Sequence, residues 1–337
     1  MTGAELRGQL ICVGVAGTRL SPGERRAFQR YAPGAVILFK RNYESREQLT
    51  ALCAEIHRAC EPAPLIAVDQ EGGRVVRFGP PFMRLDAARA LSRQHTPAEV
   101  EGLAASMARE LRAAGVAIDF APVLDVLTNP ANQVIGDRAF GTTANAVTLY
   151  GLAFMRGLRR GGVVPCGKHF PGHGNVREDS HFELPVSQVR RRSLFDVHLK
   201  PFVAAISAGI PMIMLAHVMI PWIDPARPAS LSPAVVNGIL RQQLGFAGVV
   251  ATDDLQMEAL HGIGGLEERT AAALEAGADL ILVCRPIAET EGVFAILERL
   301  AESRALRASM KVSIRRIAAL RRLVRSLPGT RTTAFFR

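Results

Sequence analysis

The chain has 337 residues, of which 48% are hydrophobic and 21% charged, and its formal net charge is +10. This length suits one large barrel domain, and the composition excludes disorder and any membrane span of about 18 uncharged apolar residues. The first ten residues are polar and lack the apolar run of a signal peptide, so we expect an unexported, cytoplasmic protein.

Eight short, β-rich apolar runs recur along the chain, and helical segments lie between most of them. In chain order the predicted strands are residues 10–15, 35–39, 65–68, 116–124, 163–166, 211–215, 249–251 and 280–284. Eight strands that alternate with helices predict an α/β protein in which a parallel sheet closes into a (β/α)8 TIM barrel. An open, doubly wound sheet is the alternative that this pattern leaves.

Glycine follows most of the predicted helices, at the position where a left-handed cap is favoured. The helices that end in this way are 97–114, 145–160, 193–208, 232–244 and 266–276. Another helix is predicted from a cap at Ser45, with Glu47 or Gln48 at capping-box distance, to about Cys60. An extra amphipathic helix, at about 304–327, follows the eighth strand, and its polar face is basic. We find no repeat or linker that divides the chain, so we predict one catalytic domain, residues 1–337, with a C-terminal helical extension.

Polar residues gather at the carboxyl ends of the predicted strands, where barrel enzymes carry their active sites. These residues are Asp69, Asp125, Lys168, His169, His217 and the pair Asp253–Asp254. Two of the loops that follow the strands, 70–96 and 170–192, are unusually long, which is typical of functional loops. We expect Asp253 to face the barrel mouth and Asp254 to point elsewhere, because neighbouring side chains alternate along a strand.

The loop after the fifth strand places an acid two residues before an imidazole, at Asp179 and His181. A carboxylate that orients an imidazole raises its pKa and makes it an acid/base near neutral pH. A structural hydrogen bond between the two is the alternative. With such a proton donor, Asp253 would complete the pair of groups that a glycosidase needs on either side of the scissile bond.

Acidic and basic residues are also mixed after the third and fourth strands. Carboxylates accept hydrogen bonds from sugar hydroxyls and arginine donates them, so Asp69 beside the arginines of 68–77 suits a sugar. Glu71 or Arg74 can instead form a supporting salt bridge. Arg138, in the segment 135–141, is a further arginine expected to face the site.

Taken together, four motifs resemble the single-domain β-N-acetylglucosaminidases of glycoside hydrolase family 3. They are residues 68–77, 135–141, 168–181 and 252–257, and the Lys-His-Phe-Pro-Gly-His-Gly run that begins at Lys168 and leads to Asp179-Ser180-His181 is the most specific. The family often has serine where Thr252 stands. Many members carry a second α/β sandwich domain, for which this chain is too short.

The resemblance implies a retaining double displacement with Asp253 as nucleophile and Asp179 and His181 as the acid/base dyad. It also implies an N-acetylglucosamine subsite formed by Asp69, Arg77, Arg138, Lys168, His169 and His217. The implied reaction is release of N-acetylglucosamine from 1,6-anhydro-N-acetylmuramic acid muropeptides during peptidoglycan recycling. We expect a monomer that needs no metal or cofactor and binds neither nucleic acid nor a membrane.

Other interpretations of the same residues stay open. One is a metal-dependent hydrolase on the same barrel, with ligands drawn from His169, His173, Asp179, His181, His217 and Asp253. Others are a substrate-assisted reaction, a phosphorylase, and a non-catalytic barrel that binds muropeptides. Trp222 could stack on a sugar or serve a structural role. The basic surface is typical of a solvated face, and attraction of an anionic partner is the alternative.

Overall fold

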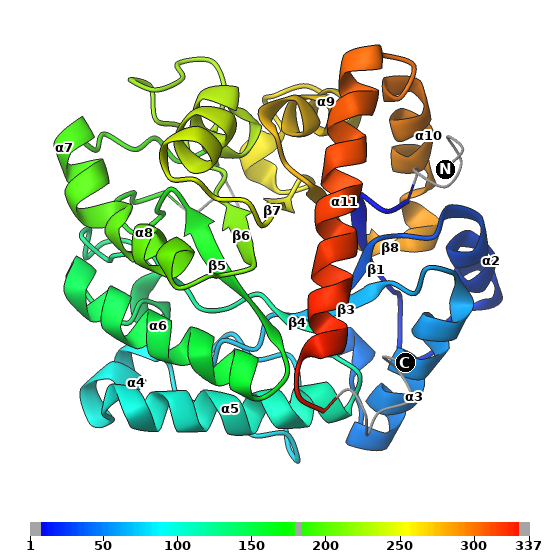
Figure 1. Cartoon of the computed structure of the whole chain (residues 1–337), viewed down its shortest axis with the longest axis horizontal. Helices are drawn as coiled ribbons and strands as arrows, with labels where there is room; N and C mark the ends of the chain where they lie inside the picture. The colour runs from blue at the N-terminus through cyan, green and yellow to red at the C-terminus, as the bar shows by residue number, and fades with distance from the viewer. Residues whose placement is uncertain (1–7, 179–182, 330–337) are drawn as a thin grey trace.

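Eight parallel strands form a closed barrel in the order in which they occur in the chain. The computed structural model describes residues 8–178 and 183–329. The strands, shown in Figure 1, are β1 (Ile11–Gly14), β2 (Ala35–Leu38), β3 (Leu65–Val68), β4 (Ile118–Asp119), β5 (Val164–Phe170), β6 (Met212–Leu215), β7 (Val249–Asp254) and β8 (Leu280–Pro286). The predicted (β/α)8 barrel is therefore confirmed, and the open sheet is excluded.

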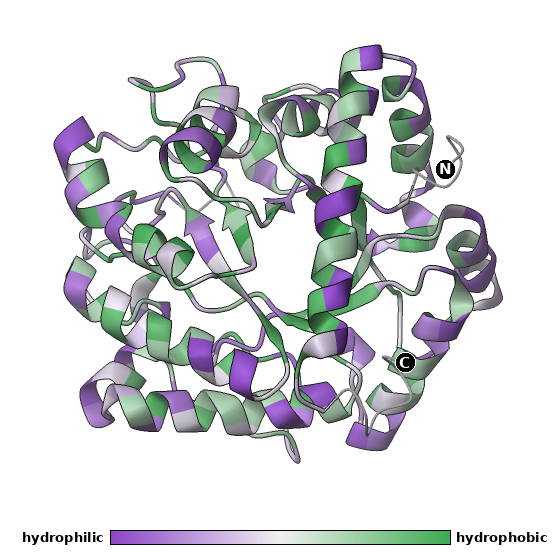
Figure 2. Ribbon diagram, viewed as in Figure 1, coloured by the Kyte–Doolittle hydropathy of each residue, from purple (hydrophilic) through white to green (hydrophobic). Residues whose placement is uncertain are grey.

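The strands are buried and the helices separate them from water. All residues of β1, β2, β3 and β6 are buried, as expected for a parallel barrel that is covered on the outside by helices. Figure 2 shows hydrophobic residues on the central strands and hydrophilic residues spread over the outer helices. The apolar runs of the sequence therefore became strands because both of their faces could be covered.

Most of the predicted helices are present with nearly the predicted ends. They include α3 (Arg46–Ala59), α5 (Pro97–Ala113), α6 (Ala144–Arg160) and α9 (Leu266–Ala276). The structure also contains three shorter helices that were not predicted, α2 (Pro22–Tyr31), α4 (Ala88–Gln94) and α10 (Glu291–Leu300). The helices α5 and α6 lie side by side (Figure 1), and a Cβ atom on Gly157 of α6 would come within 2.5 Å of the Glu101 carbonyl oxygen. Glycine at this position permits the close approach.

Two helical segments differ from the prediction. The segment predicted at 193–208 divides into α7 (Arg191–Ser193), a π-helical turn (Leu194–His198) and α8 (Lys200–Ser207). The segment expected from residue 232 onward is a π-helix over Ala234–Gln243. The sequence pattern identified helical chain in both places but could not distinguish the wider π-helical hydrogen bonding.

The fourth strand is much shorter than predicted. Residues 116–124 were expected to form it, but only Ile118–Asp119 pair with both neighbouring strands. Pro122 has no N–H to donate to a ladder, and the chain turns there toward the end of β5. The backbone N–H of Leu124 then bonds to the Lys168 carbonyl at 2.6 Å, which brings Asp125 to the tip of β5.

The C-terminal extension is the helix α11 (Arg304–Ser326), as predicted, and it lies against the outside of the barrel (Figure 1). Buried Asp279, just before β8, accepts hydrogen bonds from Ser313 at 2.7 Å and Arg316 at 2.9 Å. Arg112 of α5 donates to the Val324 carbonyl at 2.8 Å. The helices in the described ranges include none that is long and apolar enough to cross a membrane.

Candidate active site

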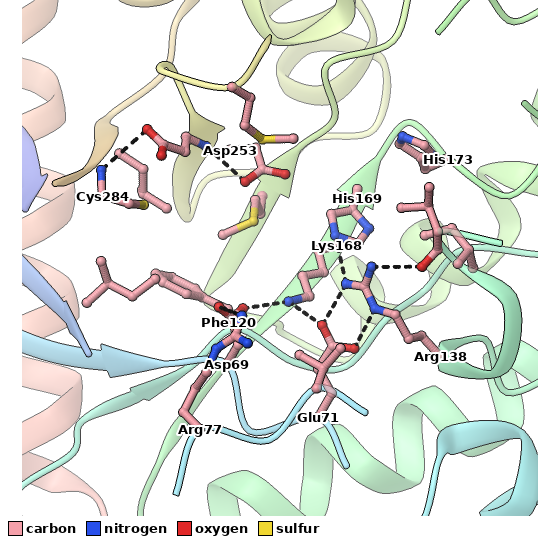
Figure 3. Close-up of a pocket in the computed structure, with 18 of the residues that line it drawn as sticks. Asp69, Glu71, Arg77, Phe120, Arg138, Lys168, His169, His173, Asp253 and Cys284 are labelled. Atoms are coloured by element: carbon pink, nitrogen blue, oxygen red, sulfur yellow. Dashed lines mark hydrogen bonds and ion pairs between the residues drawn. The ribbon is translucent and has the colours of Figure 1, made fainter. Parts of the chain in front are cut away.

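A cavity of about 680 Å³ opens where the carboxyl ends of the strands meet. Its walls come from the tips of β3, β5, β7 and β8 and from the loops after β3 and β4 (Figure 3). The predicted site residues that line it are Asp69, Arg77, Arg138, Lys168, His169 and Asp253. The predicted acid/base pair, Asp179 and His181, lies outside the described residues.

Asp69, directly after β3, holds two cations at the cavity wall. Lys168 Nζ lies 2.7 Å from its Oδ1 atom, and Arg77 Nη2 lies 3.2 Å from Oδ2. Burial alone would raise the pKa of Asp69, but Lys168 and Arg77 outweigh it and lower the pKa below its usual value. Asp69 is therefore an ionised acceptor beside two donors, an arrangement suited to vicinal hydroxyl groups.

Glu71 joins the cations of two other strands. Arg138 donates to both of its oxygens, at 2.7 and 2.8 Å, and Lys168 Nζ lies 2.6 Å from Oε1. Burial opposes ionisation of Glu71, but the charges of Arg138 and Lys168 hold its pKa far below the usual value. Glu71 thus fixes both cations, a more central role than the supporting salt bridge expected from the sequence.

His169 is held in one tautomer by Asp125. Its Nδ1 lies 2.7 Å from Asp125 Oδ2, and its Nε2 lies 3.3 Å from Arg138 Nη2. Arginine can only donate, so Nε2 accepts and Nδ1 donates to Asp125. The other Asp125 oxygen accepts the backbone N–H of His173 at 2.6 Å. Asp125 therefore positions two imidazole-bearing residues of the β5 loop.

The β7 tip presents two carboxylates rather than one. Asp253 and Asp254 both line the cavity, so the expectation that Asp254 points elsewhere is wrong. The register between β7 and β8 shifts between Ala251 and Asp254, which interrupts the alternation of side chains. Asp254 Oδ1 accepts the N–H of Gln256 at 3.0 Å.

The two neighbouring carboxyls have opposite pKa shifts. Burial raises the pKa of Asp254. Burial also acts on Asp253 in this direction, but the nearby imidazoles of His217 and His169 outweigh it and lower the pKa of Asp253. The Asp254 N–H, at 2.8 Å from Asp253 Oδ1, acts in the same direction. Asp253 is therefore the carboxyl of the pair that ionises more readily.

His217 supports the β7 tip from behind the cavity wall. It is buried, with Nδ1 at 2.7 Å from Ser230 Oγ and Nε2 at 3.0 Å from the Asp254 carbonyl oxygen. Since a carbonyl only accepts, Nε2 carries the proton. The cavity wall formed by the described residues does not include His217. Direct contact of His217 with a sugar stays a prediction.

The loop after β5 is anchored on both sides of its undescribed residues. On one side, Asn132 Nδ2 donates to the His173 carbonyl at 2.7 Å. On the other, the N–H of Ser187 bonds to the Met219 carbonyl at 2.8 Å. The Trp222 indole donates to the Val189 carbonyl at 2.7 Å while 43% of this residue is exposed. Trp222 therefore has a structural role in holding this loop.

The residues that the structure describes contain no group of three or more His, Cys, Asp or Glu side chains that could hold a metal ion. His169 and His217, two of the ligands considered from the sequence, have both ring nitrogens in hydrogen bonds with protein groups.

A closed barrel whose mouth carries an acidic pair, basic side chains and imidazoles is typical of a catalytic domain, and these hydrogen-bond donors and acceptors suit a polar substrate such as a sugar. The sequence matches the family described as "Glycosyl hydrolase family 3 N terminal domain" over residues 4–320. The chain belongs to glycosyl hydrolase family 3, as its motifs predicted, and it is a glycosidase.

Beta-hexosaminidases from other bacteria are similar in sequence to this chain over most of their length. A beta-hexosaminidase of Stenotrophomonas maltophilia (strain K279a) is 42% identical over 303 residues, which cover 88% of this chain and 90% of that protein. A beta-hexosaminidase of Thiobacillus denitrificans (strain ATCC 25259 / T1) is 48% identical over 285 residues, which cover 81% and 77%.

Solved structures show the same architecture. A glycoside hydrolase family 3 β-N-acetylglucosaminidase from Paenibacillus sp. str. FPU-7 superposes with a TM-score of 0.92 at 36% identity, over 96% of this chain and 63% of that one. NagZ from Neisseria gonorrhoeae, solved in complex with N-trifluoroacetyl-D-glucosamine, has a TM-score of 0.76 at 33% identity, over 92% and 98%.

Proposed function

We propose that this protein is a retaining β-N-acetylglucosaminidase that forms a covalent glycosyl-enzyme on Asp253. The observation that carries the proposal is the placement of Asp253, a carboxylate kept ionised at the β7 tip, across one cavity from the Asp69–Lys168–Arg77 cluster. The beta-hexosaminidase relatives and the NagZ complex with an N-acylated glucosamine support an N-acetylated sugar as the substrate.

In the first step, Asp253 attacks the anomeric carbon while His181 protonates the departing oxygen, with Asp179 orienting the imidazole. In the second step, neutral His181 takes a proton from the water that attacks the same carbon and releases the sugar. The roles of Asp179 and His181 rest on the sequence motif.

The sugar hydroxyls are bound by the charged cluster in this proposal. Asp69 accepts from them, and Lys168, Arg77 and Arg138 donate. Arg138 and Lys168 are already fixed by Glu71, so little side-chain freedom is lost when the sugar binds. Such preorganised donors strengthen binding in both the ground state and the transition state.

The proposed natural substrate is a muropeptide in which N-acetylglucosamine is linked to 1,6-anhydro-N-acetylmuramic acid. This follows from the motif resemblance, and it assigns the enzyme to peptidoglycan recycling as a cytoplasmic monomer. The glycosidase reaction itself does not depend on this assignment.

The test is to incubate the purified protein with an aryl β-N-acetylglucosaminide and with a purified anhydro-muropeptide. We expect release of the aryl alcohol and, by mass spectrometry, of free N-acetylglucosamine, while the matched aryl β-glucoside stays intact. Turnover that requires phosphate would identify a phosphorylase. Turnover abolished by a chelator and restored by zinc would identify a metal-dependent hydrolase, and muropeptide binding without turnover would identify a non-catalytic barrel.

A further inference from the structure

We propose that Gln70 is a positioning residue that holds Arg77 against Asp69, and that Asp119 anchors Gln70 from inside the barrel. The inference deepens the proposed function and rests on it, because contact of Asp69 and Arg77 with the sugar is part of that proposal. Neither Gln70 nor Asp119 lines the cavity formed by the described residues.

Gln70 closes the loop after β3 with a single side chain. It lies between two cavity-lining acids but is itself wholly buried on the opposite side of the chain. Its Nε2 donates to the Phe78 carbonyl at 3.0 Å, and its Oε1 accepts the N–H of Arg77 at 3.0 Å and of Phe78 at 3.2 Å. Between these ends the chain reverses through Gly72 and Gly73, whose φ values are +108° and +56°.

Arg77 depends on this anchor because its side chain has few other contacts. Its guanidinium bonds to Asp69 at 3.2 Å and lies over the Phe39 ring at 5.6 Å from the centroid. Its Nε atom is buried and has no hydrogen-bond partner among the residues described here. Without Gln70, the backbone N–H groups of Arg77 and Phe78 would lose their acceptor, and the ion pair to Asp69 would have to orient the Arg77 guanidinium without this support from its backbone.

Asp119 supports Gln70 from β4. Its Oδ1 accepts the Gln70 backbone N–H at 2.9 Å, and its buried Oδ2 has no hydrogen-bond partner within the described part of the chain. Burial raises the pKa of Asp119 to about 8, so it is a neutral acid at pH 7. Asparagine can replace a neutral Asp119 without losing the contact to Gln70, because its amide oxygen can accept the Gln70 N–H as Oδ1 does.

The experiment measures kcat and KM of Gln70→Ala, Gln70→Glu and Asp119→Asn on the aryl β-N-acetylglucosaminide. Gln9→Ala is the matched control, since Gln9 is also a buried amide that donates to a backbone carbonyl, Ala32, but it precedes β1 at the far end of the barrel. We expect Gln70→Ala to raise KM about tenfold and to change kcat less than about threefold, because it weakens sugar binding and leaves the chemistry intact. Gln9→Ala should leave KM unchanged.

The pH dependence of KM in Gln70→Glu tests the hydrogen bonds of residue 70 specifically, because a general loss of packing would not change it. Its protonated carboxyl can accept the two N–H groups and donate to the Phe78 carbonyl, whereas its carboxylate faces that carbonyl without a proton. KM of Gln70→Glu should therefore be close to the wild-type value at acidic pH and rise at alkaline pH, with no such rise in the wild type. Asp119→Asn should keep KM within about twofold of wild type at pH 7.

An unchanged KM for Gln70→Ala, or a KM of Gln70→Glu that does not vary with pH relative to wild type, would overturn the inference. If the wild type cleaves no N-acetylglucosaminide, the proposed function fails, and a crystal structure of Gln70→Ala then tests separately whether Gln70 holds Arg77 against Asp69. The inference predicts that the Arg77 guanidinium leaves Asp69 in that variant. Arg77 still bonded to Asp69 would refute it.

Discussion

Replacing Glu71 by glutamine should destabilise the protein strongly, because Glu71 is an acid shared by Arg138 and Lys168. The Glu71 and Arg138 side chains are only 7% and 10% exposed, and three contacts of 2.6–2.8 Å meet at this carboxylate. The Glu71→Gln variant keeps the volume and one acceptor but removes the charge that faces buried Arg138, while Lys168 keeps Asp69 as a partner. Breaking a buried ion pair in this way costs about 3–5 kcal/mol.

The expected change in melting temperature follows from the size of the chain. An unfolding entropy of about 2.1 cal/mol/K per residue, over 337 residues, corresponds to about 1.4 °C per kcal/mol. Glu71→Gln should therefore lower Tm by about 4–7 °C. The matched control is Asp137→Asn, which breaks the Arg74–Asp137 pair between the same two loops, with side chains 48% and 50% exposed. A pair so exposed contributes less than about 1 kcal/mol, so its Tm should fall by no more than about 1 °C.

Calorimetry at pH 7 on both variants and the wild type measures these changes in Tm. The kcat/KM of Glu71→Gln on the aryl N-acetylglucosaminide should also fall, since Arg138 and Lys168 lose their shared anchor. Equal Tm values for Glu71→Gln and Asp137→Asn would refute the reasoning that Glu71 neutralises two buried cations.

Two further predictions concern proton transfer and pH. His181→Ala should lose far more kcat/KM on substrates with alkyl leaving groups than on 2,4-dinitrophenyl substrates, because only poor leaving groups need a proton; equal losses on both would argue against proton donation. The pKa of Asp119 is raised to about 8 in the folded state. Between about pH 4 and pH 8 the native state therefore holds a proton on Asp119 that the unfolded chain has released, and the contribution of Asp119 to stability falls as pH rises. The Asp119→Asn variant should therefore gain stability relative to wild type from pH 5 to pH 8, by at most about 1.4 kcal/mol per pH unit, and the difference between the two Tm values should grow accordingly. A Tm difference that is flat or decreases with pH would show that Asp119 is ionised.

The barrel and much of its site could be predicted because both depend on local patterns. Each apolar run had to be a buried strand, and the polar residue that ended it had to lie at the barrel mouth. This is how Asp69, Lys168 and Asp253 were predicted to meet, although Asp69 and Lys168 are 99 residues apart in the chain. The cap at Ser45, whose side chain accepts the Gln48 N–H at 3.1 Å, was equally local.

The structure differs from the sequence prediction where contacts between distant segments override the local pattern. Alternation along a strand predicted one inward carboxylate at the β7 tip, but the register shift against β8 turns Asp254 inward as well. The central place of Glu71 depends on two partners from β5 and the β4 loop, and its sequence neighbours carry no sign of them. His217 follows the sixth strand as predicted, but the sequence did not show that its ring bonds to Ser230 and to the Asp254 carbonyl, apart from the described residues that line the cavity.

The most direct test of the central claim is covalent trapping of the nucleophile. The protein is incubated with a 5-fluoro N-acetylglucosaminyl fluoride, and its intact mass and peptide map are measured. We predict one added fluorosugar per chain, attached at Asp253, and no adduct in Asp253→Asn. Attachment to Asp254 or to another residue, or full turnover of this reagent by Asp253→Asn, would contradict the claim that Asp253 forms the glycosyl-enzyme.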